Sequence, residues 1–168
     1  MSKNKEVAAE LTAATGPSDA SGEHRDYVTM SIGGQLFGIP VLKVQDVLGP
    51  QTITRVPLAP VEVAGSLNLR GRIVTAVDVR LRLGLPKRDS DKKAMSVVVE
   101  HDGELYSLLV DTVGEVLSLE GRDYQRNPPT LNPRLREFSD GIYRLNDSLL
   151  VVLSVASLLN FGNRADAA

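Results

Sequence analysis

The sequence contains no cysteine, which excludes structural disulfides, thiolate zinc sites, iron–sulfur clusters and thiol catalysis. Its 168 residues are enough to bury roughly two-thirds of the unfolded surface, so the chain can fold without a metal or a cross-link. Neither sign of charge is in large excess, because 19 basic and 21 acidic side chains leave a net charge of −2. Bulk electrostatics therefore favours neither nucleic acid nor anionic lipid as a partner.

Long hydrophobic runs are missing too. The longest uncharged stretch covers 148–163 and is interrupted by polar residues, whereas a membrane-spanning helix needs about 20 mostly apolar residues. Residues 1–10 contain lysines but are followed by no apolar segment that would make a signal peptide. We therefore expect a cytoplasmic protein that does not insert directly into a membrane.

The sequence has no arrangement of residues that is typical of a reaction centre. The two histidines, His24 and His101, have no second histidine or carboxylate at metal-ligand spacing. Phosphate-binding glycine loops and the G-x-S-x-G nucleophile pattern are absent as well. Residues 70–93 are rich in lysine and arginine but contain no aromatic residue on which a base could stack. We therefore predict no enzyme, no metal, no cofactor and no nucleic-acid partner.

Two segments of the chain show the same succession of apolar runs. In 27–39, two strand-like runs are joined by Gly33 and Gly34, which predicts a hairpin because glycine reaches the positive φ that primed turns require. Pro40 then stands where the first residue of a short helical turn would be. The same order of strand, tight turn and strand recurs at 97–109.

Corresponding positions of the two segments keep constant offsets. Gly34 and Gly103 are 69 positions apart, and 65–77 matches 141–153 at an offset of 76. Valine-rich hairpins can resemble one another by chance, but the shared order and turn positions favour an internal duplication. We predict an all-β fold of two small β-barrel lobes, each of about five short strands, related by this duplication. Short helical turns and a short C-terminal helix, capped by Ser154, complete the prediction.

The composition also predicts how the chain is divided. The expected segments are a disordered N-terminal arm at 1–25, a folded domain at 26–162 with repeats at about 27–83 and 96–160, and a disordered tail at 163–168. Neither repeat is large enough to be stable alone, so we expect the lobes to pack together or to exchange strands.

Several segments together resemble the CheW family. The most specific is the N-L-R-G stretch at 68–71, followed by V-D-x-R at 77–80. The other matching segments are GIPVLKVQDV at 38–47, ITRVP at 53–57, Val110-Asp111, Val113, EVL at 115–117 and Leu158-Leu159. The resemblance covers about residues 27–161, so the folded domain is expected to be a CheW-like domain.

The resemblance implies a non-catalytic chemotaxis adaptor built from two SH3-like barrels around a hydrophobic interior. Such a protein couples the cytoplasmic tips of methyl-accepting chemoreceptors to the regulatory domain of the histidine kinase CheA in signalling arrays. CheA and the CheV type carry further domains, for which 1–25 leaves no room. We therefore expect a stand-alone adaptor, recruited to membrane-receptor arrays through its partners.

Carried over position by position, the resemblance also implies binding residues. The receptor groove between the lobes would include Val44, Thr54, Gly65, Met95, Val113 and Val116. Asp46 and Arg70 would form the acidic and basic pair that affects both partners. From the pattern alone, the valines are candidates for the core and Gly65 is a candidate turn residue.

Three positions depart from the family pattern. Thr75 stands where proline is usual, Asp46 where glutamate is commoner, and Ser107 where glycine is frequent. The first two lie near the proposed groove and concern the choice of partner. Two alternatives stay open: a diverged CheW-like scaffold serving a non-flagellar chemosensory pathway, and a nucleic-acid-binding small-barrel protein.

Overall fold

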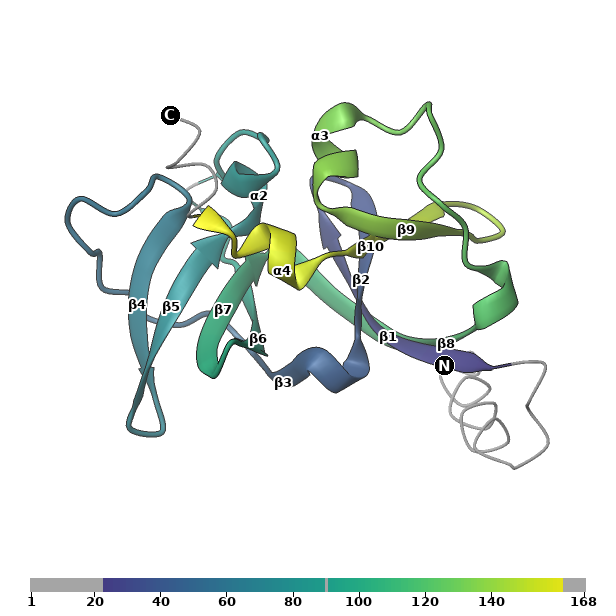
Figure 1. Cartoon of the computed structure of the whole chain (residues 1–168). Coiled ribbons are helices and arrows are strands. Elements are labelled where there is room, and N and C mark those ends of the chain that lie inside the picture. Colours follow the sequence, from purple (N-terminus) through teal and green to yellow (C-terminus); the bar gives the residue numbers. More distant parts are fainter. Residues whose placement is uncertain (1–22, 90, 162–168) are drawn as a thin grey trace.

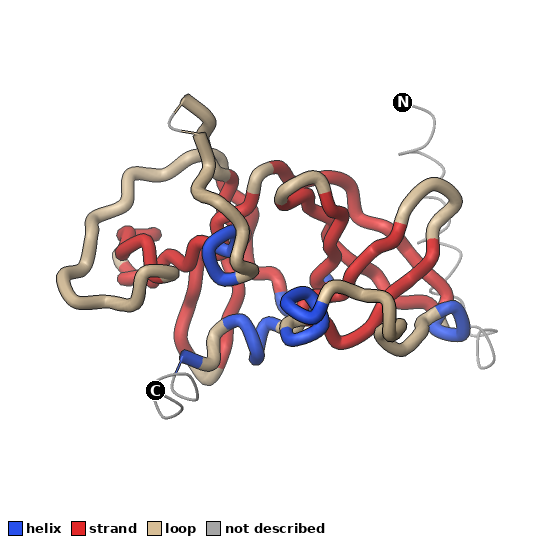
Figure 2. The backbone as a smooth tube through the Cα atoms, turned by 90° about the horizontal axis from the view of Figure 1, so that it is seen from above, coloured by secondary structure: helices blue, strands red, loops and turns tan. Residues whose placement is uncertain are grey.

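The computed structural model describes residues 23–89 and 91–161. They form two five-stranded sheets that lie beside each other (Figure 1). The helices of the described residues are short (Figure 2), and the last of them follows the final strand. The predicted all-β fold with short helical turns is therefore confirmed.

The strands fall into two sheets, which we call sheet A and sheet B. In spatial order, sheet A contains β8 (Thr112–Glu120), β1 (His24–Ile32), β2 (Gln35–Pro40), β10 (Leu149–Leu153) and β9 (Ser139–Arg144). Sheet B contains β3 (Val44–Leu48), β6 (Met95–His101), β7 (Glu104–Val110), β5 (Arg72–Asp78) and β4 (Val63–Leu69). The helices are η1 (Val41–Lys43), α2 (Val79–Arg82), η2 (Gly121–Asp123), α3 (Pro133–Glu137) and α4 (Val155–Leu158).

Each sheet is built from both repeats. Sheet A combines β1 and β2 of the first repeat with β8, β9 and β10 of the second, and sheet B combines β6 and β7 with β3, β4 and β5. The registers correspond, because Val28 pairs with Val116 in sheet A and Val97 pairs with Val47 in sheet B. Both pairings also have a bulge at the corresponding place. The duplication is thus confirmed, and the repeats exchange strands.

The exchanged strands meet in two parallel pairings. Phe37 of β2 lies opposite Val151 of β10, and Tyr106 of β7 lies opposite Thr75 of β5. After its first hairpin, each repeat passes from one sheet to the other. The first crossing is η1, between β2 and β3, and the second is Asp111, between β7 and β8.

Apolar side chains cover both faces of the sheets. The largest cluster contains residues of both sheets and forms the central core. Along β2, Phe37 and Ile39 belong to this core, whereas the alternate residue Leu36 packs with Tyr27 and Tyr143 in a separate cluster of sheet A. Sheet B has its own separate cluster. This division is compatible with the predicted SH3-like description, because each sheet encloses apolar side chains on the face away from its partner.

The helix that ends each repeat begins at a side-chain cap. The Ser154 hydroxyl accepts the Ser157 N–H at 3.2 Å at the start of α4, as predicted. Asp78 caps α2 at the corresponding place in the first repeat. α3 was not predicted, although the Asn132 cap followed by Pro133 at the first helical position is a typical start signal.

The predicted N-terminal arm needs one correction. β1 begins at His24, within the predicted arm at 1–25, because His24 and Arg25 pair with the end of β8. The polar composition of this stretch concealed a strand whose partner is remote in sequence. The rest of the predicted arm, 1–22, and the predicted tail, 163–168, lie outside the described residues.

Candidate functional site

Four predicted groove residues lie against the central core. Val113 and Val116 are on β8, Val44 begins β3, and Met95 begins β6. All four side chains are half-buried and pack against the central cluster. Each therefore contributes to the core while leaving part of its surface accessible. A role for these residues in partner binding remains a prediction.

Gly65 and Thr54 lie together on sheet B. The Thr54 N–H donates to the Ser66 carbonyl at 2.8 Å, and the Ser66 N–H donates back to the Thr54 carbonyl at 2.8 Å. Gly65 has a φ of +150°, and a Cβ atom there would collide with the Thr54 carbonyl and lie 2.8 Å from Cγ2 of Ile53. Glycine is therefore required here for the close approach of two backbone segments.

Asp46 and Arg70 form the predicted ion pair. Nη2 of Arg70 donates to Oδ2 of Asp46 at 3.0 Å. Asp46 is on β3, one edge of sheet B, and Arg70 lies in the turn after β4, the other edge. The side chains are 76% and 26% exposed for Arg70 and Asp46 respectively. Such a pair contributes about 0–1 kcal/mol to stability, so it joins the open edges of the sheet only weakly.

The turn that carries Arg70 is conformationally strained. Arg70 has a φ of 52° and Gly71 a φ of 84°, the pattern of a type I′ turn. The Asn68 side chain accepts the Gly71 N–H at 3.0 Å and supports this turn. A left-handed backbone costs an ordinary residue about 1–2 kcal/mol. Strain of this kind at an exposed position is typical of functional sites.

Leu42 was not among the predicted site residues, yet it is a strongly exposed apolar residue close in sequence to the groove candidate Val44. It lies on η1, two positions before Val44 on the chain, and it is 92% exposed. Val47, beside Asp46, and Ile73 are also exposed. The sequence contains one signal that the position of Leu42 is not a core position. The corresponding position in the second repeat is occupied by a charged residue, Asp111.

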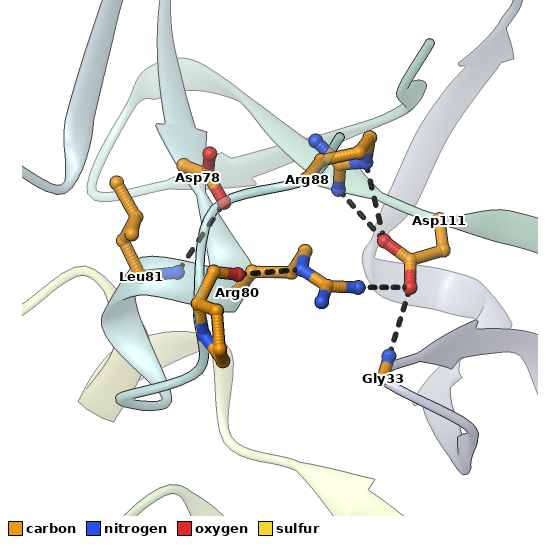
Figure 3. A network of polar contacts seen from close by, with 7 residues as sticks. Gly33, Asp78, Arg80, Leu81, Arg88 and Asp111 are labelled. Atoms are coloured by element: carbon orange, nitrogen blue, oxygen red, sulfur yellow. Dashed lines mark hydrogen bonds and ion pairs between the residues drawn. The ribbon is translucent and has the colours of Figure 1, made fainter. Parts of the chain in front are cut away.

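The Asp111 carboxylate holds three segments together at the second crossing. Oδ2 accepts the Gly33 N–H at 2.8 Å and Nη1 of Arg80 at 2.7 Å (Figure 3). Oδ1 accepts Nη2 and Nε of Arg88 at 2.9 and 3.2 Å. Burial would raise the pKa of Asp111, but the amide and the two guanidinium groups outweigh burial and hold that pKa below its usual range. The group is therefore ionised at neutral pH.

The basic segment at 70–93 does not form a single surface patch. The buried Arg82 side chain donates to the carbonyls of Leu158, Ser157 and Asn160 at the end of α4. Its guanidinium carbon lies 4.9 and 4.5 Å from the ring centres of Phe138 and Phe161. Arg80 and Arg88 are bound to Asp111, as described above. The central arginines of this segment thus connect parts of the fold.

Two features are absent from the part of the chain that the structure describes. Within 23–89 and 91–161, no group of three or more histidine, aspartate or glutamate residues could hold a metal ion. Among the same residues, no helix has the length and apolar character needed to cross a bilayer.

Known proteins share this sequence pattern and fold. A family model described as a CheW-like domain matches residues 26–162. The chain is 29% identical to "Chemotaxis protein CheW" of Helicobacter pylori over 133 residues, which cover 79% of this chain and 80% of the relative. It is 27% identical to the protein of the same name from Rhizobium meliloti over 134 residues, covering 80% and 86%. The crystal structure of the scaffolding protein TtCheW from Thermoanaerobacter tengcongensis matches with a TM-score of 0.73 and 28% identity, covering 81% of this chain and 92% of that one.

Proposed function

Because the chain belongs to the CheW-like domain family, we propose that it couples the cytoplasmic tips of methyl-accepting chemoreceptors to the regulatory domain of the histidine kinase CheA. A chemotaxis scaffold role agrees with the names of its relatives. The proposal adds the two partners, the absence of catalysis, and recruitment from the cytoplasm to membrane-receptor arrays.

The observation that carries this proposal is the placement of Arg70. Its guanidinium is exposed, lies on a strained turn, and is oriented by Asp46. A planar guanidinium can hold a carboxylate and still offer further N–H donors to a partner. Exposed Val47 and Ile73 lie near this pair in the sequence and add apolar surface. Arginine beside exposed apolar residues is typical of protein interfaces.

The receptor-binding groove is proposed on the other set of residues. Val44, Val113 and Val116 pack on the central core and keep part of their surface open. Leu42, two positions before Val44 on the first crossing, adds an exposed apolar side chain. A helix with apolar side chains on one face is the kind of segment that such a surface binds.

Titration of the purified partners tests the proposal. A receptor-tip fragment and the kinase regulatory domain are each titrated with wild-type protein, Arg70→Ala and Arg70→Lys. Arg72→Ala is the matched control, because Arg72 is another exposed arginine of the same hairpin. We expect Arg70→Ala to weaken binding by about 1–3 kcal/mol, with partial recovery in Arg70→Lys and no change in Arg72→Ala.

Two outcomes would contradict the proposed function. Failure of the wild-type protein to bind either partner would exclude the coupling role. Turnover of ATP, phosphodonors or common esters by the purified protein, abolished by changing one polar residue, would exclude a purely scaffolding role. A well-folded Arg70→Ala variant with unchanged affinities would leave the coupling role intact but remove Arg70 from the binding site.

A further inference from the structure

The proposed coupling function gives no role to Asp111, although this residue is close to two groove candidates, Met95 and Val113. Asp111 directly follows Val110, which pairs with Met95, and it precedes Val113 by two positions. Its backbone N–H donates to the Ser31 carbonyl at 3.1 Å. Both its main chain and its side chain are therefore bonded to the β1–β2 hairpin of sheet A.

The Asp111 carboxylate joins segments that are remote in sequence. Gly33 is in the turn between β1 and β2, Arg80 is on α2, and Arg88 is in the linker that leads to β6 (Figure 3). The side chains of Arg80 and Arg88 are only 19% and 12% exposed, and that of Asp111 is 22% exposed. Nε of Arg80 also donates to the Pro86 carbonyl at 2.9 Å, which ties the linker to α2. Partly buried, charge-assisted contacts of this kind are stronger than surface ion pairs.

The first crossing shows that passage between the sheets does not itself require this network. At the position corresponding to Asp111, the first repeat has Leu42, which is 92% exposed. The chain turns there through η1, directly after Pro40. Since one repeat makes the same crossing without a carboxylate, the network around Asp111 serves something besides the bend.

We propose that Asp111 is a positioning residue for partner binding. Its carboxylate locks the linker and the second crossing to the hairpin of sheet A, and so fixes the spacing of Met95 and Val113 in the groove. Asp111 acts through these residues and does not itself contact the partner. This inference rests on the proposed function, because it concerns the shape of the receptor groove.

The test compares isosteric changes of two aspartates that line the same surface hollow. Asp111→Asn removes the charge and keeps an oxygen that can accept the Gly33 N–H. Asp89→Asn is the matched control, because Asp89 is exposed and lines the same hollow of about 510 Å³ as Arg80 and Arg88. Each variant is titrated with the receptor-tip fragment at a temperature where its denaturation curve shows full folding. We expect about a tenfold loss of affinity for Asp111→Asn and wild-type affinity for Asp89→Asn.

A second variant and a second measurement separate positioning from general destabilisation. Arg88→Gln breaks one side of the network and should reduce affinity less than Asp111→Asn. The double variant should bind as weakly as Asp111→Asn alone, since both changes remove the same contact. Amide hydrogen exchange of Gly33 should become faster in Asp111→Asn and stay unchanged in Asp89→Asn, without any partner present.

The possible results distinguish this inference from the proposed function. Wild-type affinity in a folded Asp111→Asn variant would overturn the positioning role and leave the coupling function intact. Equal losses in Asp111→Asn and Asp89→Asn would also overturn it, because a general charge effect would then suffice. If the wild-type protein does not bind the receptor fragment, the proposed function is overturned and the inference with it.

Discussion

The hydroxyl groups of Ser96 and Ser107 are bonded to each other in the interior of sheet B. The corresponding residues in sheet A are Tyr27 and Gly38, and a Cβ atom at Gly38 would lie only 3.3 Å from Cβ of Tyr27. A large residue beside glycine in one copy is thus replaced by two small polar residues in the other. Ser107, which departs from the family pattern, is accommodated because Ser96 is small and supplies a hydrogen-bond partner.

This pair predicts a strong departure from additivity. Ser96→Ala or Ser107→Ala alone leaves a buried hydroxyl without its partner and should cost about 1–3 kcal/mol. The double variant removes both polar groups and should be nearly as stable as the wild type. Chemical denaturation of the four proteins measures the interaction energy. Additive losses in the double variant would show that the hydroxyl contact does not stabilise the fold.

Local signals predicted the hairpins, because turn residues and apolar alternation lie within a few positions of each other. The Gly33-Gly34 turn and the Ser154 cap were both of this kind. The exchange of strands was left open, because pairings such as Phe37 with Val151 depend on contacts between distant segments. The early start of β1 at His24 was missed for the same reason.

The candidate site depended more on resemblance than on pattern. The contact between Asp46 and Arg70 joins opposite edges of a sheet, which apolar periodicity does not predict. Arg88 lies in a basic stretch of the sequence that gives no sign of a partner, whereas its side chain is only 12% exposed and pairs with Asp111. Ion pairs between remote segments leave no local signal, because each partner alone looks like a surface charge.

The strained turn at Arg70 predicts that stability and binding can be changed in opposite directions. Asparagine adopts a positive φ more readily than arginine does. Arg70→Asn should therefore keep or raise the free energy of unfolding, despite the loss of an ion pair that contributes about 0–1 kcal/mol. Binding to the kinase domain and the receptor fragment should weaken as in Arg70→Ala. Thermal unfolding and titration of the same preparation provide both values, and a clear loss of stability in Arg70→Asn would contradict the turn analysis.

The lowered pKa of Asp111 predicts a dependence of stability on acid. Because this carboxyl has a lower pKa in the folded protein than in the unfolded chain, its contribution is present above the ordinary carboxyl pKa of about 3.9. The contribution is lost as the pH falls through the lower folded-state value. The charged residues that line the surrounding hollow are Arg80, Arg88, Asp89, Lys92 and Lys93.

Denaturation of wild type and Asp111→Asn between neutral pH and acid measures this effect. The wild type should be the more stable protein at pH 7, and the difference should shrink steadily below about pH 4. Asp89→Asn, in the same hollow, provides the control and should follow the wild-type curve more closely. A difference that stays constant down to strong acid would exclude the ionised carboxylate as its cause.

Gly65 offers the clearest separation of a structural role from a binding role. A side chain at this position meets the backbone of Thr54, which is fixed by two hydrogen bonds to Ser66. Gly65→Ala should therefore cost more than about 2 kcal/mol, beyond the cost of positive φ alone. Gly34→Ala isolates that cost, because Gly34 has a φ of +81° with open space around its Cβ position. Gly34→Ala should lose only about 1–2 kcal/mol.

The two glycine variants also decide how a loss of binding at Gly65 is interpreted. If Gly65→Ala lowers the melting temperature well below that of Gly34→Ala and binds the receptor fragment poorly, the glycine acts by allowing two backbones to meet. Binding should then recover at lower temperature, where the folded fraction is restored. A Gly65→Ala protein with the melting temperature of the wild type and no affinity would instead place Gly65 in direct contact with the partner, because a clash with the Thr54 carbonyl could not then be present.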